Sequence, residues 1–135
     1  MTRSDRLRVR EDLRDNYFDN PQAWADFEAG LDRIAAIARK QDVCLVMLLH
    51  TALDRLDAAH PYLDVYERVG AAASARGFAV VASFPYFEGK RAQALNVSPY
   101  DPHPNAEGHA LLSRALESGL RDLPVGCWEL PPPAP

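Results

Sequence analysis

VCLVMLL, at residues 43–49, is a run of seven apolar residues and therefore has no polar face. A strand that faces water on one side alternates apolar and polar residues, whereas a strand covered by helices on both faces is apolar throughout. Residues 78–84, FAVVASF, form a second run of nearly the same kind. The two runs therefore predict neighbouring strands of a parallel sheet that is buried on both faces.

Helical periodicity surrounds both runs. Apolar residues recur at three- and four-residue steps through residues 21–40, which predicts an amphipathic helix with Asn20 as its N-cap. The same period predicts a helix over residues 63–76 that stops near Gly77, and a third helix that Asn105 caps. The order helix–strand–helix–strand–loop–helix predicts an α/β fold whose parallel strands are joined by right-handed crossovers.

The length of 135 residues allows one domain with a real core, and we divide it into three segments. Residues 1–20 are a charged segment of mixed sign, residues 21–122 are the α/β domain, and residues 123–135 are a proline-rich tail. A net charge of −4 and the lack of a basic stripe argue against nucleic acid as a partner. No run is apolar enough for a membrane span and no signal peptide is visible, so the sequence leaves the location undetermined.

The chain has two cysteines, Cys44 within the first apolar run and Cys127 near the C-terminus. Two cysteines are too few for a disulfide scaffold. We therefore expect both to be ordinary thiols.

The candidate functional residues lie in the stretch DPHPNAEGH at residues 101–109. Asp101 stands two residues before His103, and a carboxylate beside an imidazole fixes the tautomer of a general base and stabilises its protonated form. Prolines on both sides of the histidine restrict the backbone, so we expect the pair on a stiff loop. That loop, residues 85–104, follows the second strand, at the sheet edge where α/β proteins place their chemistry.

These residues resemble the last conserved block of the SGNH, or GDSL, family of ester hydrolases. That block consists of Asp, a short spacer, His-Pro-Asn/Ser, and Gly-His at the head of the final helix. The resemblance implies a flavodoxin-like three-layer α/β/α fold and a Ser-His-Asp triad in which Asp101 orients His103, the general base. It also implies a small-molecule ester as the substrate, with no metal or organic cofactor. The likeness extends over residues 24–120, although only the nine-residue motif is specific.

The chain departs from the family pattern in two places. A single residue, Pro102, separates Asp101 from His103, where two residues are most common. The Gly-Asp-Ser turn that holds the family's nucleophile is missing, as are the glycine and the Gly-x-Asn-Asp block of the oxyanion hole. None of the six serines has the strand–turn–helix context that exposes a nucleophile. We therefore expect a fragment that begins after the third strand of the fold and is inactive in isolation.

Other interpretations of the same residues stay open. Asp101 and His103 can be a turn whose side chains merely satisfy backbone groups, and His109 can pack locally at the start of its helix. Metal binding by these three residues matches no spacing typical of a metal site. His50 and His60 are interpreted as ordinary polar residues, the first at a strand end and the second before a proline.

A second function also stays open, because a two-stranded parallel ladder has little stability of its own. The chain can be a complete, non-catalytic α/β module that binds a partner, or a half-domain whose sheet another chain completes. An exposed edge strand would also favour self-association.

Overall fold

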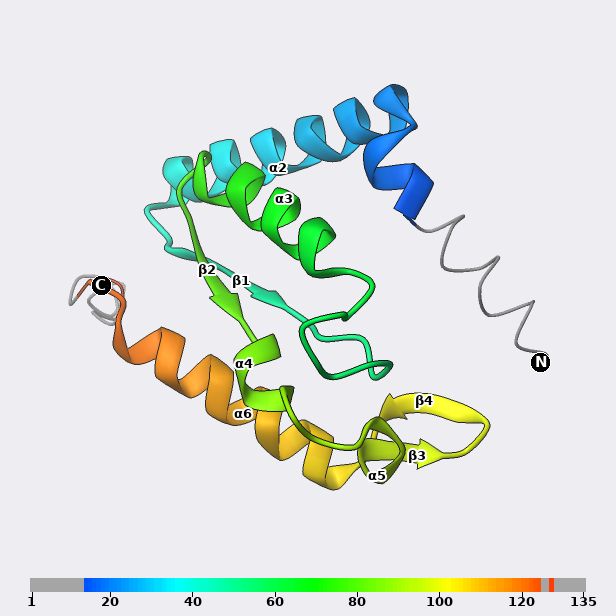
Figure 1. Cartoon of the computed structure of the whole chain (residues 1–135). Coiled ribbons are helices and arrows are strands. Elements are labelled where there is room, and N and C mark those ends of the chain that lie inside the picture. Colours follow the sequence, from blue (N-terminus) through cyan, green and yellow to red (C-terminus); the bar gives the residue numbers. More distant parts are fainter. Residues whose placement is uncertain (1–13, 125–126, 128–135) are drawn as a thin grey trace.

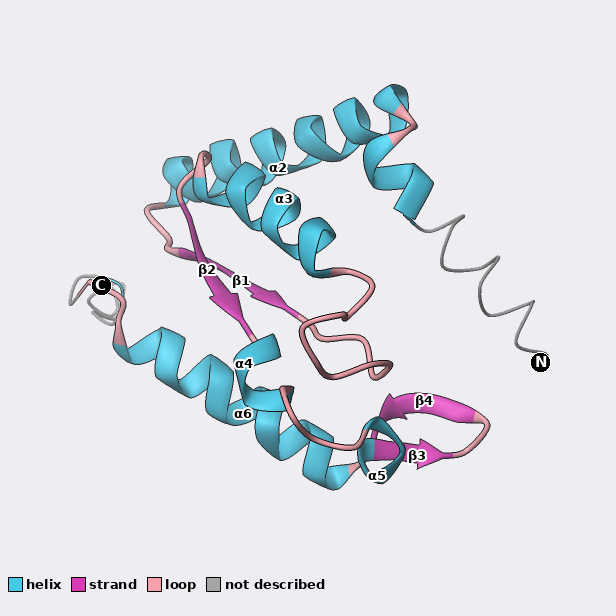
Figure 2. Ribbon diagram, viewed as in Figure 1, coloured by secondary structure: helices cyan, strands magenta, loops and turns pink. Residues whose placement is uncertain are grey.

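The two apolar runs form adjacent parallel strands, as the sequence predicts. In the computed structural model, which describes residues 14–124 and Cys127, β1 (Leu45–Leu49) pairs with β2 (Phe78–Ala82). Their register is unbroken over the five residues of each strand. The protein is therefore mixed α/β with a small parallel sheet (Figures 1 and 2).

Helices lie on both sides of this sheet (Figure 1). α2 (Pro21–Gln41) and α3 (Leu63–Ser74) lie on one side, and α6 (Ala106–Arg121) lies on the other. These bounds closely match the ranges that the apolar period predicts. Within the part of the chain that the structure describes, no helix combines the length and the apolar character that a membrane crossing requires.

The helix ends follow from local capping chemistry. The Asn20 side chain accepts a hydrogen bond from the Ala23 backbone N–H at 3.0 Å, and Pro21 occupies the first turn, where a missing N–H costs nothing. Gly77 has a φ of +88° after α3, a conformation that residues with a Cβ rarely adopt. The predicted caps at Asn20 and Asn105 and the predicted stop near Gly77 are confirmed.

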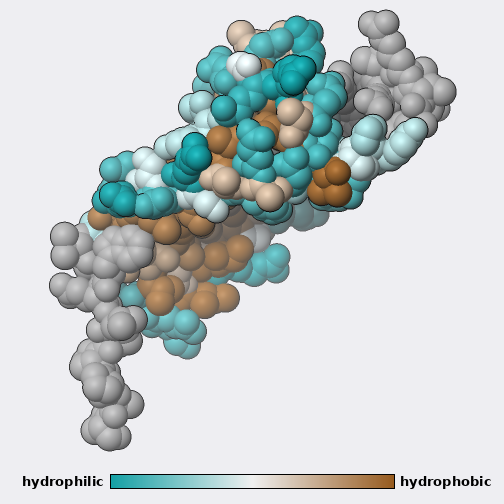
Figure 3. Space-filling model, turned by 90° about the horizontal axis from the view of Figure 1, so that it is seen from below, coloured by the Kyte–Doolittle hydropathy of each residue, from teal (hydrophilic) through white to brown (hydrophobic). Residues whose placement is uncertain are grey.

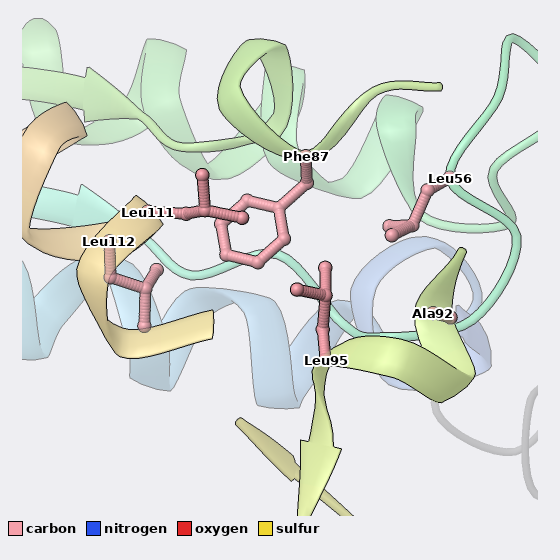
Figure 4. Close-up of a cluster of buried hydrophobic side chains, with 6 residues drawn as sticks. All are labelled: Leu56, Phe87, Ala92, Leu95, Leu111 and Leu112. Carbon is pink, nitrogen blue, oxygen red and sulfur yellow. The ribbon is translucent and has the colours of Figure 1, made fainter. Parts of the chain in front are cut away.

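Two clusters of buried apolar side chains join the layers. The first lies between the sheet, α2 and α3, and contains Leu31, Ala35, Ala72, Ala73 and Phe78. The second attaches α6 to the segments around it and contains Leu56, Phe87, Ala92, Leu95, Leu111 and Leu112 (Figure 4). Phe87 and Leu95 are only 0% and 1% exposed, and burying side chains of this size stabilises a fold by about 2 kcal/mol each.

The prediction of a single loop over residues 85–104 is wrong, because this segment contains regular structure. It includes most of α4 (Phe84–Phe87), all of α5 (Ala92–Leu95), and an antiparallel hairpin of β3 (Asn96–Ser98) and β4 (Asp101–Pro104). Elements of three or four residues are too short to show a helical or strand period. The sequence pattern therefore could not reveal them.

The prediction that both strands are buried on both faces is also wrong. Every residue of β1 is only partly buried, and Ala82 at the end of β2 is exposed. α6 packs closely on β2 at Gly119. The space there is so small that a Cβ on Gly119 would lie only 2.2 Å from Val81 Cγ2. The helices in the described ranges therefore leave part of β1 uncovered.

Cys44 and Cys127 form a disulfide bond, so the expectation of two free thiols is wrong. Their Cα atoms lie 5.6 Å apart although 83 residues separate them in the sequence. The pairing depends on how α6 runs back along the sheet, which no local pattern around either cysteine shows. Most of the predicted charged segment, residues 1–20, and most of the predicted tail, residues 123–135, lie outside the described residues.

Two glycines within helices offer a matched test of packing. A Cβ at Gly30 in α2 would meet no atom within 4 Å, whereas a Cβ at Gly119 in α6 would overlap Val81. We expect Gly30→Ala to raise the free energy of unfolding by about 1 kcal/mol, because alanine is the better helix former. Gly119→Ala should lower it by roughly 1–3 kcal/mol through overpacking. Urea denaturation measures both values, and a stabilised Gly119→Ala variant would contradict the close packing of α6 on β2.

Candidate active site

A short hairpin presents the two predicted site residues. β3 and β4 pair antiparallel, with Ser98 opposite Asp101. At the turn, Ser98 Oγ accepts hydrogen bonds from the backbone N–H groups of Tyr100 at 3.2 Å and Asp101 at 3.1 Å. A serine side chain thus closes the turn and fixes the point where β4 begins. Asp101 and His103 both lie on β4.

Asp101 and His103 are in contact, as predicted. Asp101 Oδ1 accepts a hydrogen bond from the His103 backbone N–H at 3.0 Å and lies 2.6 Å from His103 Nδ1. One carboxylate oxygen therefore holds both the backbone and the ring of the histidine. When Nδ1–H donates to this oxygen, the ring is in the tautomer whose Nε2 has a free lone pair. A general base needs this form.

The same hydrogen bonds favour the ionised form of Asp101. Its pKa is lowered from 3.8, first by the bond from the His103 backbone N–H and then by the bond to the ring. Because folding depresses this pKa, the stabilising interaction is present above the pKa of the unfolded chain and is lost as the pH falls through the folded value. The carboxylate is therefore charged at neutral pH, which is the state that stabilises an imidazolium.

The dyad lies on an open surface. The His103 side chain is 83% exposed and the Asp101 side chain is 46% exposed. One hollow, of about 530 Å³, lies beside Cys44 at the opposite end of the strands, and another, of about 410 Å³, lies beside β2. Neither includes Asp101 or His103, so neither of these hollows forms a cleft around the dyad.

Asn105 anchors the far end of the hairpin. Its Oδ1 accepts hydrogen bonds from the backbone N–H groups of Glu107 and Gly108, at 3.0 and 3.1 Å, and so caps α6. Its Nδ2 donates to the backbone oxygens of Ala94 at 2.9 Å and Asn96 at 3.2 Å. A single side chain therefore joins α5, β3 and α6 next to the dyad.

Gly108 allows the first turn of α6 to lie against the hairpin. A Cβ at this position would lie 2.8 Å from Pro104 Cβ and 3.2 Å from the Leu95 backbone oxygen. Any larger residue would have to push β4 away from the helix. The asparagine and glycine of the motif thus fix the platform on which Asp101 and His103 are held.

Two histidines, His103 and His109, influence the titration of a third, His50, at this end of the sheet. His50 directly follows β1, and its pKa is lowered from 6.5, first by burial and then by the charges of His109 and His103. His103 lies on β4 and His109 near the start of α6, so three separate elements contribute. The structure therefore adds His50, which the sequence suggested was an ordinary polar residue, to the surroundings of the dyad. Among the residues described, no cluster of three His, Cys, Asp or Glu side chains could hold a metal ion.

Removing one of these neighbours should shift the titration of His50. His109→Ala eliminates a charge that opposes protonation, so we expect the pKa of His50 to rise. Because folding lowers the pKa of His50, the free energy of unfolding decreases as the pH falls below about 6.5. In the His109→Ala variant the pKa is lowered less, so this decrease should be smaller. An NMR titration of the His50 ring measures the shift. An unchanged pKa would contradict this electrostatic influence of His109 on His50.

No described serine is placed as a nucleophile for His103. Ser83 is fully buried, and its Oγ donates to the Leu49 backbone oxygen at 2.7 Å while it accepts a bond from the Thr51 N–H at 3.0 Å. Ser98 Oγ is occupied by the hairpin turn. The remaining serines are Ser74, Ser113 and Ser118, at exposed helix positions, and Ser4, which lies outside the described residues.

His60 has a larger structural role than the sequence suggested. It is 5% exposed, its Nε2 lies 3.0 Å from the Ala52 backbone oxygen, and its Nδ1 accepts a bond from the Tyr62 N–H at 3.1 Å. Tyr66 Oη accepts the Ala52 N–H at 2.8 Å. These bonds fix the segment between β1 and α3. They depend on tertiary contacts, so no sequence signal could have identified them.

Comparisons with protein-family models, with curated proteins and with solved structures found no match to this chain. The resemblance to a family of ester hydrolases therefore depends on residues 101–109 alone.

Proposed function

We propose that this chain carries the general base and the orienting carboxylate of a serine ester hydrolase of the SGNH, or GDSL, type. The observation that supports this most strongly is the 2.6 Å contact between Asp101 Oδ1 and His103 Nδ1, made by a ring whose other nitrogen is accessible. A turn that only satisfied backbone groups would need the bond to the His103 N–H but not the bond to the ring. The match of the surrounding motif to the family adds the reaction class.

In this proposal, His103 moves a proton between the nucleophile and the leaving group. Nε2 takes the proton of a serine hydroxyl as the oxygen attacks the acyl carbon of the ester. Asp101 holds Nδ1–H and stabilises the imidazolium that results, and its lowered pKa keeps it ionised at neutral pH. The proton then passes from Nε2 to the leaving alcohol as the carbon–oxygen bond breaks. A small-molecule ester is the substrate class.

The nucleophile and the oxyanion hole come from polypeptide outside this sequence in the same proposal. The serines of the described residues do not contact the ring, and the dyad has no enclosing wall. A flavodoxin-like sheet extended by further strands would supply both, and helices on the two sides of β1 and β2 are compatible with that architecture.

The test compares the isolated chain with a completed protein. We expect the 135 residues alone to hydrolyse short-chain aryl esters no faster than buffer, because neither a nucleophile nor an oxyanion hole is present. The product of the same reading frame extended upstream, or an upstream fragment added in trans, should restore turnover. Hydrolysis by the isolated chain that disappears when one of its serines is replaced would overturn this placement of the nucleophile.

A non-catalytic half-domain is the second candidate. The exposure of His103 and the partly uncovered β1 favour it. Esterase activity of the completed protein distinguishes the two candidates, because a binding module would assemble with its partner without acquiring this activity.

A further inference from the structure

β1 has an open edge. The Leu49 backbone oxygen accepts a hydrogen bond from the Ser83 N–H at 3.3 Å, so the backbone groups of Leu49 point toward β2. Backbone groups alternate between the two edges along a strand, so those of Val46 and Leu48 point away from β2. No other strand in the described ranges pairs with them. Their N–H and C=O groups are therefore available to a further strand.

One side of α2 faces the space next to this edge. Glu28 and Asp32 bond to Arg76, just after α3, at 3.3 and 2.7 Å. Ile34 and Ile37 lie about 180° around the helix from these carboxylates, because each residue turns an α-helix by about 100°. They therefore project away from α3.

α3, in contrast, lies directly over the two strands. A Cβ on Gly70 would lie 3.2 Å from Leu49 Cδ1 and 3.4 Å from Val80 Cγ1. α2 leads directly into β1 and packs beside α3. In Figure 1, α2 and β1 lie behind α3 and β2, so the outer side of α2 extends beyond β1. A strand added to the edge of β1 would lie beneath Ile34 and Ile37.

The side chains around this edge are apolar and exposed. Ile34 is 47% exposed, Ile37 is 58% exposed and Val43, just before β1, is 53% exposed. In the view from below, brown apolar atoms gather into a continuous area bordered by teal polar ones (Figure 3). We call Ile34, Ile37, Val43, Val46 and Leu48 the β1 edge surface.

The outer edge of β2 has a different character. The hollow beside it is lined by Ser118 and Asp122 as well as by apolar residues. A charged side chain next to a strand edge is a common device against strand pairing. The edge of β1 has no such protection within its edge surface, so the two edges are not equivalent.

We propose that the β1 edge surface is a docking site for one apolar β-strand of another polypeptide, which adds to the sheet beside β1. Main-chain hydrogen bonds to Val46 and Leu48 provide the affinity, as in other strand additions. On the docked strand, the side chains that face α2 should be uncharged, because they would pack against Ile34 and Ile37. This inference uses no step of ester hydrolysis, but it is linked to the proposed function, because the further strands of an extended sheet would add at this same edge.

The geometry favours a single strand over a second copy of the chain. Two copies that paired through β1 would each bring an α2 over the same gap between strands. Neighbouring strands are about 4.8 Å apart, whereas packed helices need about 8–10 Å between their axes. Two α2 helices would therefore compete for one space, while a lone strand leaves α2 where it is.

The test uses a synthetic peptide with the sequence of β2, residues 78–83, flanked by lysines for solubility, because β1 already pairs with this sequence. In amide hydrogen exchange, we expect a saturating amount of peptide to slow exchange at Val46 and Leu48 at least tenfold. Exchange within residues 78–82 should stay unchanged. Faster exchange there would mean that the peptide displaces β2, and it would overturn the proposal.

Two exposed positions supply matched variants. Ile37→Glu places a charge on the β1 edge surface and should weaken peptide binding by about tenfold or more, which corresponds to about 1.4 kcal/mol. Val97→Glu makes the same change on β3, where the side chain is 57% exposed, and should leave binding unchanged. Failure of the peptide to bind, or equal effects of the two variants, would overturn the proposal. A dimer of the natural chain in analytical sedimentation that Ile37→Glu dissociates would also overturn the proposal, because a second copy of the chain would then occupy the edge of β1.

Discussion

If the upstream-extended protein is the ester hydrolase that we propose, replacing His103 with alanine is expected to lower its kcat by about 10³-fold or more, with KM nearly unchanged. Removal of the base from a serine triad costs up to about 10⁶-fold, and the activity that is left comes from the oxyanion hole and from binding. The His103 side chain is 83% exposed, so its loss should not disturb folding. The measurement is the hydrolysis of an aryl ester by the upstream-extended protein.

Two further variants separate catalysis from structure. Asp101→Asn keeps the shape of the side chain but removes the charge that fixes the tautomer, so we expect a decrease in kcat of up to about 10⁴-fold. His109→Ala removes a neighbouring imidazole that does not contact Asp101 and should leave most of the activity. If His103→Ala retained full turnover, the dyad would be only a structural turn.

Loss of the Cys44–Cys127 disulfide is expected to lower the free energy of unfolding by about 4 kcal/mol. The bond closes a loop of 83 residues, and loop-closure entropy in the unfolded chain gives an effect of this size for loops of that length. Within residues 14–124, the two parallel strands and three long helices offer few other long-range constraints. Urea denaturation with and without a reductant measures the difference.

The double variant Cys44→Ser/Cys127→Ser provides the matched control for this experiment. It should unfold at the same urea concentration with and without reductant, close to the reduced natural chain. If the natural chain were equally insensitive to reductant, the two thiols would not be joined in solution.

The long elements were predictable because each repeats its signal many times. The period of α2 runs over 21 residues, and the all-apolar run at β1 predicted a strand, although the structure leaves that strand only partly buried. The hairpin at Asn96–Ser98 and Asp101–Pro104 has no comparable repetition, and its position follows from contacts of Asn105 with α5 and β3. Short elements of this kind are determined by tertiary hydrogen bonds that the sequence does not display.

The same distinction divides the candidate site. Asp101 and His103 are two residues apart, so their contact could be inferred from the chain itself. The lowered pKa of His50 depends on burial and on His103 and His109, which β4 and α6 bring near the end of β1. The Cys44–Cys127 bond was missed for this reason as well, because it joins residues that are 83 positions apart in the sequence.

The two bonds that Asp101 Oδ1 makes to His103 have a consequence for how such a pair can be inherited or transplanted. One oxygen of Asp101 holds both the backbone and the ring of His103, two positions later, so the carboxylate has a high effective concentration at the imidazole. The contact within the pair is local, but the position of the pair depends on Ser98, which closes the turn, and on Asn105, which joins the hairpin to α5 and α6. A chain that is cut or recombined beside this turn therefore keeps the contact between carboxylate and imidazole as long as the hairpin itself still forms.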